Sequence, residues 1–291
     1  MQVVFHIGAH CTDEDRLLKS LLKNRDALQQ HGIVVPGPSN YRKLIRQTLK
    51  TLDGAQPAAG AEANLLKSIS HSEQIDRLVL SAEDFLTFVP WIFVNQTLYG
   101  NAMGRIPALA GLFPSADIEF HLALRNPATF IPATFARTKG TTLEQFMRGV
   151  APHEVRWSTL IHTIRASAPD AKLTVWCNED TPMIWPRLMR ELSGFDSDVP
   201  FEGEADLLAE IITPNGVQRY RSYLASHPPQ SAPQHSRIIT AFLDKFAIED
   251  ALEDELDAPG WTQQLVDDLT RLYEEDLDEI IRIAGVNFIA P

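Results

Sequence analysis

Residues 3–15 read VVFHIGAHCTDED, and this stretch predicts how the chain begins to fold. The apolar run over 3–7 predicts a short buried β-strand that stops at Gly8. A helix is expected directly afterwards, because leucines recur on one face at positions 17, 18, 21, 22 and 28. Thr12 is the expected N-cap of that helix, followed by acidic residues in its first turn. The chain is therefore predicted to open as strand, glycine-containing turn and helix.

Three further strands are predicted in the first two thirds of the chain. They lie at 77–81, 118–124 and 172–177, and each ends in a polar segment. Helical patterns occur between and after them, including 157–168 and 183–192. Strands that alternate with helices in this way are typical of βαβ units. We therefore expect an α/β protein with a mostly parallel central sheet.

The sequence after Gly194 shows helical patterns only. They cover 206–212, 217–226, 238–245 and 262–284, with a Pro/Gln/Ser linker at 228–233. No internal repeat is evident. We interpret 1–291 as a single α/β domain, with an α/β core at 1–195 and a helical C-terminal extension at 196–291.

The net charge of −12 over 291 residues is concentrated near the C-terminus. Residues 244–279 hold fourteen acidic side chains and two basic ones, and the remainder is balanced at 24 of each. This distribution argues against a nucleic-acid binder and against binding to an anionic membrane. The sequence leaves open whether the acidic helices face water or lie on a partner, such as a second copy in a homo-oligomer.

The composition also predicts a compartment. No run of about 18 apolar residues occurs, so no transmembrane helix is expected. The first residues lack the basic and long apolar regions of a signal peptide. Cys11 and Cys177 are the two cysteines, and their spacing excludes a disulfide scaffold and a cysteine-type zinc finger. We therefore expect a protein of the reducing cytoplasm.

Polar motifs follow the predicted strands, and their order resembles that of the bacterial sulfotransferase family. They read HIGAHCTDED at 6–15, SAEDF at 81–85, RNP at 125–127 and NED at 178–180. The family opens with a strand and a loop of the form HIGxxKTGTT, has a second strand ending near SxE, and later a strand ending in RNP. The resemblance covers about residues 2–195. It implies a P-loop NTPase-like, three-layer α/β/α fold.

The resemblance also implies an activity and a site. The family transfers a sulfuryl group from 3′-phosphoadenosine 5′-phosphosulfate (PAPS) to a hydroxyl or amine, and leaves 3′-phosphoadenosine 5′-phosphate (PAP). The residues of the implied donor site are Gly8, Ala9, Cys11 and Thr12 at the 5′ end, and Arg125 with Thr134 at the 3′-phosphate. Thr134 is named because Ala133 replaces the family serine. Glu83 or His10 would act as the base on the acceptor.

Two departures from the family loop leave the activity open. Cys11 stands where the family has its lysine, and Asp13, Glu14 and Asp15 replace its glycine and hydroxyl residues. Two unit charges about 4 Å apart interact by about 4 kcal/mol at an effective dielectric constant of 20, so acids here would repel a phosphate. One hypothesis is an active transferase. The alternative is an inactive sulfotransferase-fold protein that serves as a binding, regulatory or assembly module.

Other chemistries have weaker support. His6, His10 and Cys11 are close in sequence and are residue types that bind Zn²⁺, but His6 lies on a strand expected to be buried. We predict no metal site. Cys11 is also a candidate nucleophile before a helix, although the neighbouring acids would raise its pKa. The aromatic stretch 85–93 is either core or the lining of an acceptor pocket. Neither GxxxxGK[ST] nor GxGxxG occurs, which argues against a nucleoside triphosphatase and a dinucleotide enzyme.

Overall fold

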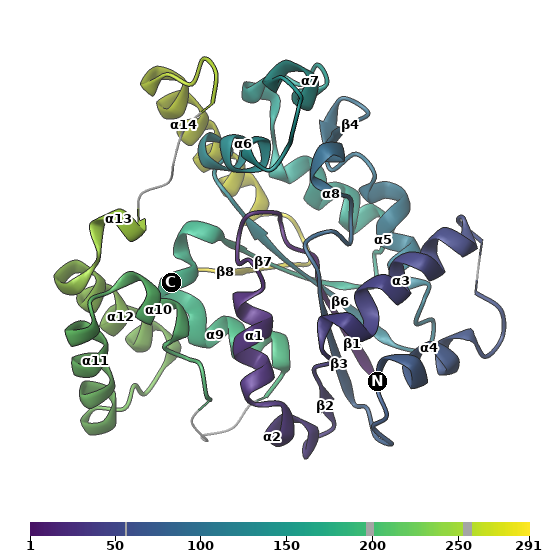
Figure 1. Ribbon diagram of the computed structural model, residues 1–291, viewed down its shortest axis with the longest axis horizontal. Helices are drawn as coiled ribbons and strands as arrows, with labels where there is room; N and C mark the ends of the chain where they lie inside the picture. Colours follow the sequence, from purple (N-terminus) through teal and green to yellow (C-terminus); the bar gives the residue numbers. More distant parts are fainter. Residues whose placement is uncertain (56, 196–200, 253–257) are drawn as a thin grey trace.

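A six-stranded parallel sheet forms the centre of the molecule (Figure 1). The computed structural model describes residues 1–55, 57–195, 201–252 and 258–291. The strands are β1 (Gln2–His6), β2 (Ile33–Val34), β3 (Arg77–Ser81), β6 (Asp117–Leu124), β7 (Lys172–Cys177) and β8 (Val286–Ile289). Their spatial order is β2-β3-β1-β6-β7-β8, and every neighbouring pair is parallel. The predicted α/β class and the mostly parallel sheet are confirmed.

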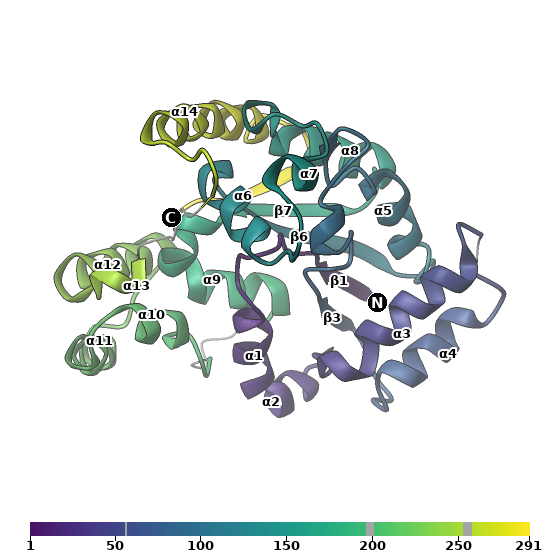
Figure 2. The same cartoon turned by 45° about the horizontal axis from the view of Figure 1, so that its top comes forward.

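Helices cover both faces of this sheet, as in a three-layer α/β/α fold. On one face Phe5 and Leu122 pack in a core with side chains of α3 (Pro38–Leu52), α4 (Ala61–Ile69), α5 (Ala102–Ala110), α6 (Pro127–Ala136) and α8 (Trp157–Ser167). On the other face Val4 and Trp176 pack against α1 (Arg16–Lys23), α2 (Arg25–Gln29) and α9 (Thr181–Ser193). Figure 2 shows α1 and α9 on one side of the strands and α5 and α8 on the other.

The segment between β3 and α5 carries most of the aromatic stretch. It contains the 3₁₀ helix η1 (Val89–Trp91) and an antiparallel ribbon of β4 (Phe93–Val94) and β5 (Thr97–Leu98). Phe85 and Phe93 are buried in the core, whereas Phe88 and Trp91 are each 48 % exposed. The prediction of core residues therefore holds for part of the stretch only.

The C-terminal section is helical except for its last strand. Its helices are α10 (Asp206–Ile211), α11 (Pro214–Ser226), α12 (Ala232–Phe246), α13 (Glu249–Leu252) and α14 (Gln263–Ile280). The expected helix over 262–284 ends early, and Gly285, with a φ of 80°, leads into β8 along the edge of β7. A purely helical extension is therefore a wrong prediction, because four residues are too few to show a strand pattern. Residues 196–200 and 253–257 of the extension lie outside the described residues.

None of the described helices combines the length and the hydrophobicity that crossing a membrane requires. The short elements that remain are α7 (Leu143–Met147), η2 (Pro152–Glu154) and η3 (Asn178–Asp180).

A row of polar side chains crosses five strands on the face covered by α1 and α9. Ser81, His6, His121, Thr174 and Asn287 are successive neighbours in register. His6 Nδ1 lies 2.9 Å from Ser81 Oγ, but His6 Nε2 and both ring nitrogens of His121 have no hydrogen-bond partner among the described residues. Burying imidazole nitrogens without partners disfavours their charged form.

The first prediction concerns the acid stability of this row. Burial lowers the pKa of both His6 and His121 in the folded protein, although Asp13 and Glu119 oppose the shift. The unfolded chain takes up these protons near pH 6.5, so the free energy of unfolding falls as the pH drops below that value, by up to about 1.4 kcal/mol per pH unit for each histidine. Urea unfolding at about pH 7.5 and about pH 5.5 measures this loss.

His121→Leu removes one of the titrating groups and should reduce the loss. The exposed His153 provides the matched control, and His153→Gln should keep the full pH dependence of the wild type. Equal losses in His121→Leu and in the wild type would contradict the assignment.

Candidate functional site

The candidate site lies where the winding of the sheet reverses. β1 and β6 are neighbours, but the chain leaves β1 toward β2 on one side and leaves β6 toward β7 on the other. In open α/β sheets ligands bind outside the carboxyl ends of the strands at such a switch point. The loop 7–15 after β1 and Arg125 after β6 both lie there.

The loop after β1 stays bonded to β6 beyond the end of the strand. The amide of Ala123 donates to Gly8 O at 2.7 Å, and the amide of Ala9 donates to Ala123 O at 3.2 Å. Gly8 has a φ of 102°, and a Cβ at this position would lie 3.3 Å from Glu83 Cα. Glycine is therefore required between the two neighbouring strand ends.

His10 is buried against Tyr99, which follows β5. The Tyr99 hydroxyl accepts the His10 amide hydrogen at 3.1 Å and lies 2.8 Å from His10 Nδ1, and the two rings stack. The hydroxyl can donate its own hydrogen to Nδ1 while it accepts the amide hydrogen, an arrangement in which the ring proton is on Nε2. Burial lowers the pKa of His10 to about 4. His10 is therefore neutral at physiological pH and a weak base.

Cys11 lies within a cluster of two arginines and Glu83. Its carbonyl oxygen accepts a hydrogen bond of 2.5 Å from Arg125 Nη1, and its Sγ lies 3.6 Å from Arg137 Nη1. Arg137 also donates to both carboxylate oxygens of Glu83, at 2.5 and 2.8 Å. The Cys11 amide donates to Glu83 Oε2 at 3.4 Å. The structure thus brings together Cys11, Glu83 and Arg125, three of the predicted site residues.

The charges of this cluster limit its chemistry. Burial raises the pKa of the Cys11 thiol, and the arginines beside it do not reverse the shift. Burial also acts to raise the pKa of Glu83, but the hydrogen bonds and charge of Arg137, together with His10 and the Cys11 amide, outweigh it and hold the pKa below its ordinary value. The thiol is therefore protonated at neutral pH and a poor nucleophile, and the paired carboxylate is a weak general base.

The acidic residues of the loop are largely compensated within the protein. Asp15 forms a bidentate ion pair with Arg42 of α3, at 2.5 and 2.9 Å, and the hydrogen bonds from Arg42 lower the pKa of Asp15. Arg42 Nε also donates to Ser81 O at 2.9 Å. Glu14 is exposed and lies 3.2 Å from Arg16. The repulsion of a phosphate that the sequence predicts is therefore weaker, because ion pairs compensate Asp15 and Glu14.

The N-cap residue of α1, the helix after the loop, is Asp15 and not Thr12, and Asp13 binds amides of its first turn. Asp13 Oδ2 accepts the Leu17 amide at 3.1 Å, and Asp13 O accepts the Arg16 amide at 2.8 Å. Thr12 Oγ1 donates back to Ala9 O at 2.7 Å. The N-cap prediction at Thr12 is wrong, because the loop runs three residues further before α1 begins.

Two more predicted segments have structural partners. Thr134 is fully buried in α6, and its hydroxyl donates to Phe130 O at 2.7 Å, so the structure does not bring this hydroxyl to the loop. The side-chain oxygen of Asn126 caps α6 by accepting the Ala128 amide hydrogen. The backbone N–H of Asn126 donates to Glu179 Oε1 at 2.7 Å. Glu179 thereby joins the end of β7 to the RNP turn.

The sequence singles out neither Tyr99 nor Arg42 as members of the site. Tyr99 belongs to the ribbon segment, and Arg42 lies within a helix whose pattern only indicates a buried face. Arg137, twelve residues beyond Arg125, is noticeable only as a nearby basic residue.

In the part of the chain that is described, no group of three or more His, Cys, Asp or Glu side chains is placed to hold a metal ion.

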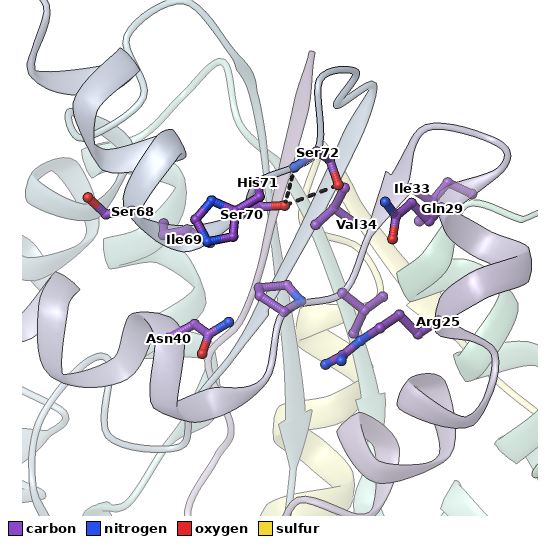
Figure 3. Close-up of a pocket in the computed structure, with 12 residues that line it drawn as sticks. Arg25, Gln29, Ile33, Val34, Asn40, Ser68, Ile69, Ser70, His71 and Ser72 are labelled. Atoms are coloured by element: carbon purple, nitrogen blue, oxygen red, sulfur yellow. Dashed lines mark hydrogen bonds between the residues drawn. The ribbon is translucent and has the colours of Figure 1, made fainter.

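Two cavities lie elsewhere in the molecule. One of about 390 Å³ borders the edge strand β2 (Figure 3). The other, of about 1490 Å³, lies between the amino ends of the strands, α9 and the α11–α12 connection. Neither is lined by the loop 7–15, so the candidate site rests on its position and chemistry and not on the size of a cavity.

The second prediction concerns the buried His10–Tyr99 pair. Tyr99→Phe removes the hydroxyl that serves both the amide and Nδ1 of His10, and it leaves two buried polar groups unpaired. We expect the free energy of unfolding to fall by about 1–3 kcal/mol in urea unfolding experiments. Tyr223→Phe is the matched control, because Tyr223 is 42 % exposed, and it should change stability little. A neutral Tyr99→Phe variant would contradict the double role of this hydroxyl.

Comparisons with protein-family models, with curated proteins and with solved structures found no match to this chain.

Proposed function

We propose that the chain is a sulfotransferase-like protein whose donor loop has become a closed structural loop, so that it acts as a binding, regulatory or assembly module and does not transfer sulfuryl groups. One observation carries the proposal: three successive backbone amides of the loop donate within the protein. The amides of Ala9, His10 and Cys11 all donate to protein oxygens. A phosphosulfate would need such amides to point at it.

The start of α1 supports the same conclusion. The Asp13 carboxylate occupies the Leu17 amide in the first turn of the helix. That position attracts anions because of the helix dipole, and a fixed carboxylate there would compete with a donor phosphate. A ligand phosphate would have to displace Asp13 before it could bind.

The catalytic groups are also poorly suited to transfer. His10 is neutral, with Nδ1 beside Tyr99, and the Glu83 carboxylate is paired with Arg137. Neither group has a pKa near the working pH, which an efficient base would need. The position of the family lysine holds Cys11, whose buried thiol carries no charge.

A second candidate function has one specific observation in its favour. Arg137 Nη1 lies 3.6 Å from Cys11 Sγ, and Arg125 donates to the Cys11 carbonyl. These guanidinium groups would place positive charge where the resemblance puts the lysine. An active transferase that uses PAPS and a hydroxyl or amine acceptor would then need Glu83 to leave Arg137.

Under either function we place the protein in the reducing cytoplasm, consistent with its two buried free cysteines.

The third prediction separates the two functions. Calorimetric titration of the wild-type protein with PAP, with and without Mg²⁺, should show no binding up to millimolar PAP. Any binding free energy is then weaker than about −4 kcal/mol, the value for a Kd of about 1 mM. Micromolar binding in either condition would overturn the loss of donor binding and favour the transferase.

A restored loop provides the matched positive variant. Cys11→Lys combined with Asp13→Gly and Glu14→Thr returns the cation and removes two carboxylates. This variant should gain measurable affinity for PAP if the loop is a converted donor site. A folded triple variant that binds no PAP would show that the loop does not correspond to the family's donor loop.

A further inference from the structure

A groove runs beside β2, the edge strand at one side of the sheet (Figure 3). Its volume of about 390 Å³ lies within the range of ligand pockets, about 300–1,000 Å³. It is lined by Arg25 of α2, Asn40 of α3, the segment 68–72 at the end of α4 and the strand β2. The groove is separate from the loop after β1.

The backbone of β2 leaves hydrogen-bonding groups in this groove. Ile33 and Val34 pair in register with Arg77 and Leu78 of β3, and Gly32 O accepts the Arg77 amide at 3.1 Å. Alternate residues of a strand point their N–H and C=O groups to opposite sides. The groups of residues 32 and 34 therefore face β3, and those of Ile33 and Val35 face away from it.

These outward groups have no hydrogen-bond partner among the described residues, and both residues line the groove. Ile33 is 6 % exposed and Val35 is 2 % exposed. Buried backbone groups are almost always paired with protein or with a ligand or water. Four such groups, at a spacing of two residues, or about 6.6 Å along the strand, match the hydrogen-bonding repeat of an added strand.

The rim of the groove supplies a charge. Arg25 is exposed and makes no hydrogen bond or ion pair with the described residues. Figure 3 shows its side chain at one end of the groove and the Ser70 and Ser72 hydroxyls at another part of the rim, bonded to each other. A guanidinium without a partner favours a carboxylate, because charge-assisted bonds between these groups are the strongest of the common hydrogen bonds.

We propose that this groove binds an extended peptide that adds as a strand to the outer edge of β2, with an acidic residue of the peptide paired to Arg25. The main chain of the peptide supplies partners for Ile33 and Val35, and its alternate side chains contact the residues that line the groove. This inference does not rest on the proposed function.

The walls of the groove favour a single peptide over another sheet. An open edge strand is a hazard because it invites pairing with other chains, and proteins limit this with very short edge strands and covering elements. β2 has two residues and lies between α2 and the end of α4. A strand this short with elements on both sides disfavours pairing with a whole sheet.

The fourth prediction uses a phage-displayed library of random heptapeptides as the probe. Selection on the folded full-length protein should enrich peptides that carry β-branched residues and at least one Asp or Glu. The best of them, made with a fluorescent label, should bind in anisotropy titrations. Arg25→Glu should weaken this binding about tenfold or more. Lys50→Glu, with the same charge change at an exposed position on α3, should leave it unchanged.

Two measurements test the strand addition itself. The peptide should slow hydrogen exchange of the Ile33 and Val35 amides in the wild-type protein, which needs no variant. Val35→Pro removes the outward N–H and should weaken binding, whereas Val35→Ala keeps it and should bind. Failure to enrich any peptide, binding unaffected by Arg25→Glu, or unprotected amides at Ile33 and Val35 would each overturn the proposal.

Discussion

Two hydrogen bonds between Ala123 of β6 and the loop after β1 set the geometry of the whole carboxyl end of the sheet. They join Ala123 to Gly8 O and to the Ala9 amide, and so extend the pairing of β1 and β6 into the loop. Each contributes only about 0.5–1.5 kcal/mol to stability. Their larger effect is directional, because they bring the following amides of His10 and Cys11 to Tyr99 and Glu83. A backbone held in this way cannot also direct those amides at an anion.

Arginines from three different elements then complete the closed loop. Arg42 from α3 neutralises Asp15, Arg125 at the end of β6 binds the Cys11 carbonyl, and Arg137 after α6 binds Glu83. Each guanidinium serves a group of the loop or of the neighbouring strand end. Removing one partner of a half-buried pair leaves a charge without compensation, which costs more than the pair contributes. The loop and its arginines therefore stabilise one another, and opening the loop for a ligand would disturb all three contacts.

The parts of this structure that the sequence predicts are those fixed by local patterns. β1, β3, β6 and β7 follow from apolar runs, and Gly8 follows from the turn that must succeed β1. The contacts that decide the chemistry are long-range: His10 and Tyr99 are 89 residues apart, and Glu83 and Arg137 are 54 apart. A motif scan names Glu83 and His10 as candidate bases, but it cannot show that their partners weaken them as bases. The donor and acceptor roles drawn from the family resemblance stay predictions.

The loop after β1 and the outer edge of β2 differ in whether their backbone groups have hydrogen-bond partners. At the carboxyl end of β1 the amides of residues 9, 10 and 11 donate within the protein. At the outer edge of β2 the backbone groups of Ile33 and Val35 line the groove and have no hydrogen-bond partner among the described residues. Folding has a strong requirement to pair buried polar groups, so the edge that lacks partners is the place where an additional chain improves the energy most. A protein with a hydrogen-bonded loop after β1 and an open strand edge at β2 is better built to hold a peptide at that edge than an anion at that loop.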